Sequence, residues 1–98
     1  MSIESIIQEE ARLTILKELA KQPNKALTSE AVRRFLLDFL LIDKPREWVE
    51  AQFQYLSDLS AVDVLPAGSV KIARLSERGE LHLSGRICIA GIQRPGQV

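Results

Sequence analysis

The chain has 98 residues, of which 46% are hydrophobic and 27% charged, and its 13 basic and 13 acidic side chains give a net charge of zero. This length fits one globular domain with a thin core, and the composition excludes a disordered chain. Zero net charge disfavours a protein that holds nucleic acid mainly through phosphates, because each contact needs a Lys or Arg. From residue 65 onward, however, the sequence is positive, since Glu77 and Glu80 are outnumbered by Lys71, Arg74, Arg78, Arg86 and Arg94.

Cys88 is the single cysteine, so no intramolecular disulfide is possible, and it forms no zinc-ligand pattern with His82. No cofactor is therefore expected. The first residues lack the basic and apolar regions of a signal peptide, and the apolar run 39–42 is too short to cross a bilayer. These features predict a cytoplasmic protein without a membrane partner.

The first predicted helix lies near the N-terminus and ends at about Lys21, before Gln22-Pro23-Asn24. Either Ser2 or Ser5 fits as its N-cap. Apolar residues recur at helical spacing: Ile6, Ile7, Ala11, Leu13, Leu16, Leu19 and Ala20.

A second helix is predicted to begin after Thr28, an N-cap residue, with Glu30 suited to the positive end of the helix dipole. One continuous apolar stripe is expected to be buried: Val32, Phe35, Leu36, Phe39 and Leu40. Leu37 and Leu41 lie off this stripe. Packing against a neighbouring helix is the favoured interpretation for them, and a dimer interface is the alternative.

Residues 45–60 predict a third helix, with Pro45 at its first helical position. An inward stripe is formed by Val49, Phe53 and Leu56, and a flanking stripe by Trp48, Gln52, Tyr55 and Leu59. The remaining face consists of Glu47, Glu50, Ala51, Gln54 and Asp58. The face left for a ligand is therefore acidic.

Residues 62–65 and 70–73 are rich in β-branched side chains and flank a Pro-Ala-Gly-Ser turn, which predicts a β-hairpin. Ser76 is placed to cap a short last helix that ends at Gly85. The tail, residues 86–98, is compatible with an extra strand, a dimer arm or an ordered coil packed on the core.

This order of elements predicts an α+β winged helix-turn-helix fold: three helices, a short hairpin wing, and a short C-terminal helix or tail. The whole chain, 1–98, is expected to form one domain with its core at about residues 6–85. The third helix then occupies the place from which such domains usually read the major groove.

Two segments resemble winged-helix regulators. Residues 11–19 (Ala-Arg-Leu-Thr-Ile-Leu-Lys-Glu-Leu) are similar to the first helix of many such proteins. Residues 73–79 (Ala-Arg-Leu-Ser-Glu-Arg-Gly) resemble the third strand and helix start of the multiple-antibiotic-resistance and arsenic-repressor types. Residues 91–95 resemble the tail of small winged-helix proteins of Mu-like prophages. The resemblance covers about residues 6–85 and implies sequence-specific DNA binding as a dimer.

The candidate contacts to duplex DNA come from three places. They are Lys44, Arg46 and Gln54 on the third helix, Lys71 and Arg74 on the wing, and Arg33 and Arg34 as backbone clamps on the second helix. The chain departs from the family at Glu47, Glu50 and Asp58, where basic or neutral polar residues are usual. Because the wing turn lacks Lys and Arg, backbone contact is expected there rather than insertion into the minor groove.

The alternative is a winged-helix interaction module in which the acidic third helix meets a basic protein partner. Enzymatic functions are disfavoured, because the close carboxylate pairs (Glu9 and Glu10, Glu47 and Glu50, Glu77 and Glu80) are typical of solvated helix faces. His82 is predicted to be a surface or half-buried helix residue, and Cys88 a small buried apolar group. Trp48 and Tyr55 are expected to pack on the core rather than stack on bases.

Overall fold

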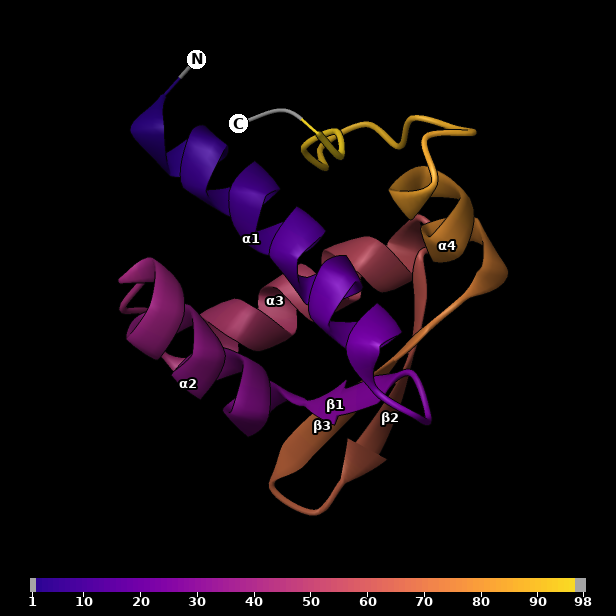
Figure 1. The fold of residues 1–98 in the computed structure, drawn as a ribbon. Helices are drawn as coiled ribbons and strands as arrows, with labels where there is room; N and C mark the ends of the chain where they lie inside the picture. Colours follow the sequence, from indigo (N-terminus) through magenta and orange to yellow (C-terminus); the bar gives the residue numbers. More distant parts are fainter. Residues whose placement is uncertain (1, 97–98) are drawn as a thin grey trace.

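The computed structural model describes residues 2–96 and contains the predicted order of helices and hairpin, with one additional strand (Figure 1). The elements are α1 (Ile3–Lys21), β1 (Ala26–Thr28), α2 (Ser29–Leu40), α3 (Arg46–Asp58), β2 (Val62–Ala67), β3 (Val70–Leu75) and α4 (Glu77–Leu83). In Figure 1, α1 crosses in front of α3, α2 lies beside them, and the sheet extends from one end of the helical part. This is the predicted α+β winged-helix arrangement.

Helix α1 begins at Ile3 because Ser2 caps it: the Ser2 hydroxyl accepts a hydrogen bond of 3.1 Å from the amide of Ser5. Its end at Lys21 is confirmed. Burial is concentrated in the second half, at Ala11, Leu13, Ile15, Leu16 and Leu19. Ile6, which was expected on the apolar stripe, is exposed because the first turns of α1 extend beyond the core.

Helix α2 is capped as predicted, with the Thr28 hydroxyl accepting from the amide of Ala31. Val32 and Leu36 are buried, but the predicted continuous buried stripe is wrong at Phe39, which is exposed. Leu41 ends the helix in the left-handed conformation, at φ 56°, and its side chain is also exposed. The favoured interpretation, packing of Leu41 against a neighbouring helix, is therefore wrong.

Helix α3 begins at Arg46, so Pro45 is the N-cap residue and not the first helical residue. The predicted inward residues Val49, Phe53 and Leu56 are fully buried. Gln52 is buried with them, because its amide is hydrogen-bonded to the backbone of Trp48 and to Arg12.

The sheet has the order β1-β3-β2, with both pairs antiparallel. The predicted hairpin is confirmed, and each strand is two residues longer than expected. Gly68 in the turn has φ 63°, a conformation that glycine adopts without strain. Along β3, Ala73 and Leu75 are buried whereas Arg74 is exposed, so one face of the sheet covers the helices and the other is open.

Helix α4 is capped by Ser76, whose hydroxyl accepts from the amide of Gly79 at 3.1 Å. It ends at Leu83, and Gly85 follows in the left-handed region, with its amide donating to the carbonyl of His82. Of the alternatives for the tail, the structure has the ordered coil: Ile89 and Ile92 are buried in the core. Residues 97 and 98 lie outside the described part.

His82 fastens this tail to α4. It is fully buried, and its Nδ1 accepts a hydrogen bond of 3.1 Å from the amide of Ile89. The ring nitrogen Nε2 therefore carries the proton and donates to the carbonyl of Gln93 at 3.0 Å. The prediction of a surface or half-buried histidine is wrong. So is the prediction of a buried Cys88, because the neighbouring Ile89 takes the inward position and leaves the thiol exposed.

Arg12 forms a second set of polar contacts, which joins α1, α3 and the tail. Its guanidinium donates to the side-chain carbonyl of Gln52 at 2.9 Å and to the backbone carbonyl of Gly91 at 2.8 Å. The same group lies over the ring of Tyr55, 3.6 Å from the centroid, and the Tyr55 hydroxyl donates to the carbonyl of Ala90. Burial lowers the pKa of Arg12, although the group keeps its charge.

Candidate nucleic-acid interface

Three of the predicted DNA contacts, all arginines, lie near Glu30 of α2. Arg33 donates to both carboxylate oxygens of Glu30, at 2.9 and 2.6 Å. This hydrogen bonding lowers the pKa of Glu30 and raises that of Arg33, and the nearby charges of Arg46 and Arg34 lower the pKa of Glu30 further. We call Arg33, Arg34 and Arg46 the arginine cluster; Arg33 is hydrogen-bonded to Glu30, and the charges of Arg34 and Arg46 act on this carboxylate from further away.

Ser29 connects this cluster to the wing. Its buried hydroxyl donates to the carboxylate of Glu50 at 2.8 Å and accepts from the amide of Lys71 at 3.2 Å. The same carboxylate of Glu50 lies 3.8 Å from Nε of Arg46. The start of α2, the first half of α3 and the start of β3 are thus held together, with the exposed Lys71 side chain beside them. Glu50, predicted to lie on a solvated face, is half-buried in this contact.

The exposed face of α3 is acidic, as the sequence indicates. It is formed by Glu47, Ala51, Gln54 and Asp58, which follow one another at helical spacing. The amide of Gln54 donates to Asp58 at 2.7 Å, so one of its hydrogen-bonding groups is already engaged. No basic side chain belongs to this stripe, so its charge opposes contact with phosphates.

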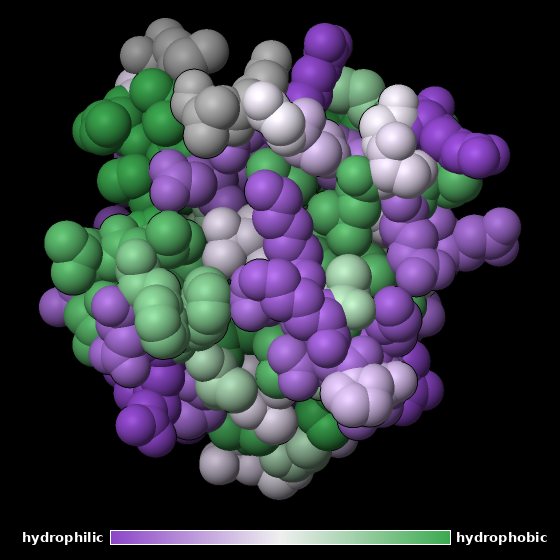
Figure 2. Space-filling view, in the orientation of Figure 1, coloured by the Kyte–Doolittle hydropathy of each residue, from purple (hydrophilic) through white to green (hydrophobic). Residues whose placement is uncertain are grey.

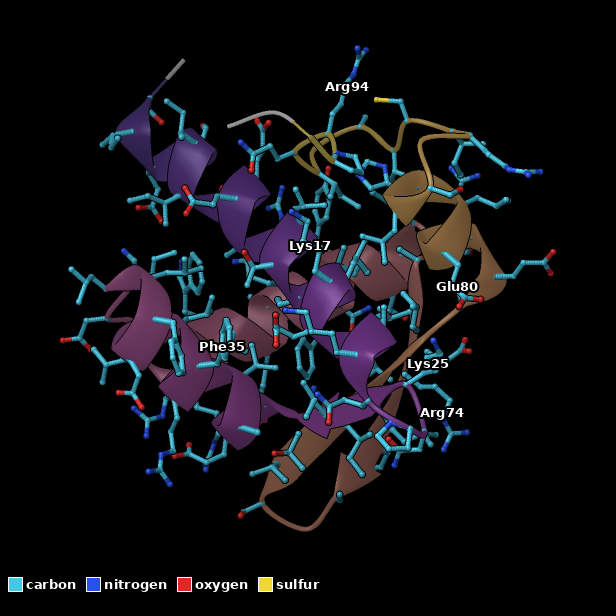
Figure 3. The ribbon with its side chains drawn as sticks, in the orientation of Figure 1. Lys17, Lys25, Phe35, Arg74, Glu80 and Arg94 are labelled. Atoms are coloured by element: carbon cyan, nitrogen blue, oxygen red, sulfur yellow. The ribbon has the colours of Figure 1, made fainter. Side chains whose placement is uncertain are left out.

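The other predicted contacts lie apart from the cluster. Lys44 contacts Glu4 at 3.4 Å and lies over the ring of Trp48, 5.6 Å from the centroid, at the junction of α1 and α3. Arg74 lies on the opposite face of the sheet from Lys71, because residues three apart on a strand point to opposite sides. Figure 3 shows Arg74 near Lys25 and Glu80, on the β1 side of the sheet.

Features of other site classes are absent from the described part of the chain. Within residues 2–96, no group of three or more His, Cys, Asp or Glu side chains is arranged to hold a metal ion. None of the helices described there combines the length and hydrophobicity needed to cross a membrane.

The comparisons with known proteins define the fold class. No protein-family model matches this chain, and no curated protein sequence matches it. A solved structure, the hsRosR-S4 complex, is similar in fold, with a TM-score of 0.59 and 17% sequence identity over 81% of this chain and 74% of that chain. The hsRosR-S4 structure has a winged-helix fold. The chain therefore has the winged-helix fold that its sequence predicts.

Proposed function

We propose that this protein is a non-enzymatic, DNA-binding transcription regulator that acts as a dimer and contacts duplex DNA at the junction of α2, α3 and β3. The observation that carries the proposal is the junction itself, where Arg33, Arg46 and Lys71 come together on a winged-helix scaffold. The likeness to a winged-helix regulator supports it.

The charge balance of the junction sets the expected strength of binding. Glu30 and Glu50 already interact with two of its arginines, and Glu47 lies on the neighbouring exposed stripe. With about three phosphate contacts, the logarithm of the binding constant should fall with the logarithm of salt concentration with a slope of about −3. We expect weak, strongly salt-dependent binding to mixed-sequence DNA.

The direct test is a fluorescence-anisotropy titration of a mixed-sequence duplex at several salt concentrations. Changing both Arg46→Ala and Lys71→Ala is expected to weaken binding about tenfold or more and to reduce the salt slope by about 2, since two phosphate contacts are lost. Lys17→Ala is the matched control, because Lys17 is exposed on α1 (Figure 3), a helix that contributes no residue to the junction. Equal affinities of the double variant and the wild-type protein would remove the junction from DNA binding.

Glu30→Gln is expected to strengthen DNA binding rather than weaken it. The change abolishes the charged pair with Arg33 and releases its guanidinium for a phosphate, so affinity for the same duplex should rise about fivefold with a steeper salt dependence. Glu77→Gln removes one exposed carboxylate from α4 and serves as the control for net charge. If Glu30→Gln and Glu77→Gln raise the affinity equally, the gain in affinity comes from the overall charge, and Arg33 does not contact a phosphate.

A second candidate function, a protein-interaction module, rests on the acidic stripe of α3. A partner with a basic surface would meet Glu47 and Asp58 without the repulsion that phosphates suffer. This candidate predicts no duplex binding by the folded protein even at low salt. It also predicts binding to a lysine-rich peptide that is lost when Glu47→Gln and Asp58→Asn are combined.

A further inference from the structure

Exposed apolar side chains gather at the ends of two helices. Ile3 and Ile6 of α1 are 72% and 42% exposed, Phe39 of α2 is 71% exposed, and Leu41 just beyond α2 is 85% exposed. Figure 2 shows hydrophobic atoms along the side of the molecule formed by α2 and the N-terminal end of α1. We call these four residues the apolar end.

The area of the apolar end matches one half of a small dimer interface. A large side chain offers on the order of 150–250 Å² when fully exposed, so the four exposed fractions amount to about 500 Å². One side of a standard interface buries about 800 Å², of which roughly 60% is apolar. The apolar area available is therefore about what a second copy would bury.

A cavity of about 120 Å³ lies along the same helix, between α1, β1 and α2. Its wall is mainly apolar. Its lining residues are Ile15, Leu27, Ala31, Val32, Phe35 and Leu36, together with Thr14, Glu18 and Gln22. A cavity of roughly 150 Å³ holds a benzene molecule, whereas sites for larger ligands start at about 300 Å³. The cavity therefore has room for about one aromatic ring.

The spacing of residues along α2 places the exposed ring of Phe39 on the same side of the helix as Ala31 and Phe35, which line the cavity. Ala31, Phe35 and Phe39 follow one another at intervals of four residues and share one side of the helix. The rings of Phe35 and Phe39 are packed together, 4.7 Å between centroids. With a rise of about 1.5 Å per residue, Ala31 and Phe39 lie about 6 Å on either side of Phe35.

We propose that a second copy of this chain covers this surface, with the two α2 helices antiparallel about a two-fold axis at Phe35. Phe39 of each copy then lies opposite Ala31 of the other and enters the cavity beside it. Such an interface is self-complementary, as two-fold symmetry requires. It does not depend on DNA binding, and it gives the expected dimer a defined surface.

Charge complementarity supports the antiparallel arrangement. Arg34 and Asp38 flank Phe35 on the same side of α2, both are exposed, and neither forms an ion pair within residues 2–96. In the antiparallel pair, Arg34 of one copy and Asp38 of the other are offset by about 3 Å along the axis. Arg34 then belongs to the dimer interface, which leaves Arg33, Arg46 and Lys71 for phosphates.

The test is sedimentation equilibrium of the full chain, without DNA, from low micromolar to submillimolar concentrations. The wild-type protein is expected to reach twice its chain mass of 11.0 kDa. Phe39→Glu is expected to weaken dimerisation at least a hundredfold, since two charged groups replace the two buried rings. Leu65→Glu is the control, because it places the same charge at a half-exposed apolar residue of β2. Circular dichroism verifies that both variants are folded.

A charge exchange tests the register. Arg34→Glu alone and Asp38→Arg alone are each expected to weaken dimerisation several-fold, and the two changes together to restore it. A wild-type protein that stays monomeric, or a Phe39→Glu protein that dimerises as well as the wild type, would overturn the proposal. Equal weakening by Leu65→Glu would also overturn it, and failure of the charge exchange to restore the dimer would overturn the antiparallel register. The DNA titration tests Arg46 and Lys71, so its outcome is independent of the outcome of the dimerisation experiment.

Discussion

Replacing Arg12 with Met is expected to lower the free energy of unfolding by about 3 kcal/mol. The change removes two hydrogen bonds from a charged donor, each contributing on the order of 1.5–3 kcal/mol, while Met keeps most of the apolar stem. It leaves the carbonyl of Gly91 and the side-chain oxygen of buried Gln52 without their donor. Urea unfolding followed by the fluorescence of Trp48, the single tryptophan, measures the effect.

Lys17→Met controls for the loss of a positive charge from the same helix, since Lys17 is exposed. Its effect should stay within about 0.5 kcal/mol. Hydrogen exchange at the amide of Ile89, which donates to His82, tells whether the tail is released along with the lost stability. An Arg12→Met protein as stable as the Lys17→Met protein would show that the contacts of Arg12 contribute nothing to holding the tail.

The elements that the sequence predicts well are those governed by neighbouring residues. The caps at Thr28 and Ser76 each depend on a hydroxyl and an amide three residues further on, and both are present. The end of α1 at Lys21 follows from the Gln-Pro-Asn segment, and the hairpin follows from the Gly68 turn. All of these signals are local, so the chain carries them without its tertiary structure.

The missed features depend on partners far along the chain. Strand β1 has three residues, too few for an alternating pattern, and it forms because β3 offers an open edge. The burial of His82 depends on Ile89 and Gln93 in a tail whose path no periodicity indicates. Phe39 matches the apolar stripe of α2, but the core does not extend to that end of the helix.

For the candidate site, the sequence indicates the types of residue, whereas the fold decides which of them lie together. The pair Arg33 and Glu30, three residues apart on a helix, was readable from spacing alone. The opposite faces of Lys71 and Arg74 are readable as well, because the two residues are three positions apart on one strand. The contact of Ser29 with Glu50 joins residues 21 apart, and that of Lys44 with Glu4 residues 40 apart, so only the folded chain reveals them.

Ion pairs compensate part of the basic charge of the predicted DNA contacts. Arg33, Lys44 and Arg46 each lie within 4 Å of a carboxylate, so half of the six basic side chains predicted to contact DNA are compensated locally. Of the basic side chains predicted to contact DNA, Arg34, Lys71 and Arg74 are exposed and form no ion pair within residues 2–96. Phosphate binding at the junction must therefore compete with carboxylates already in place, which is why Glu30→Gln is expected to strengthen it.

Gly79→Ala is expected to destabilise the protein by about 2–3 kcal/mol, although alanine favours a helix over glycine by about 1 kcal/mol. Gly79 is buried in the first turn of α4, where a Cβ would overlap the carbonyl oxygen of Ala61 and lie 2.6 Å from Cδ1 of Leu75. Ala61 is unable to retreat, because its amide donates to Leu56 and its carbonyl accepts from Ser76. Urea unfolding measures the change.

Glu80→Ala is the matched control, since Glu80 is the next residue of α4 and is exposed. Its contact with Lys25, at 3.8 Å on the surface, contributes little, so the control should stay within about 0.5 kcal/mol of the wild-type protein. The sign of the Gly79→Ala effect is decisive, because helix propensity and the contact with Ala61 act in opposite directions. A more stable Gly79→Ala protein would mean that α4 is not packed on the backbone of Ala61, and the glycine of the Leu-Ser-Glu-Arg-Gly segment would then have no packing role.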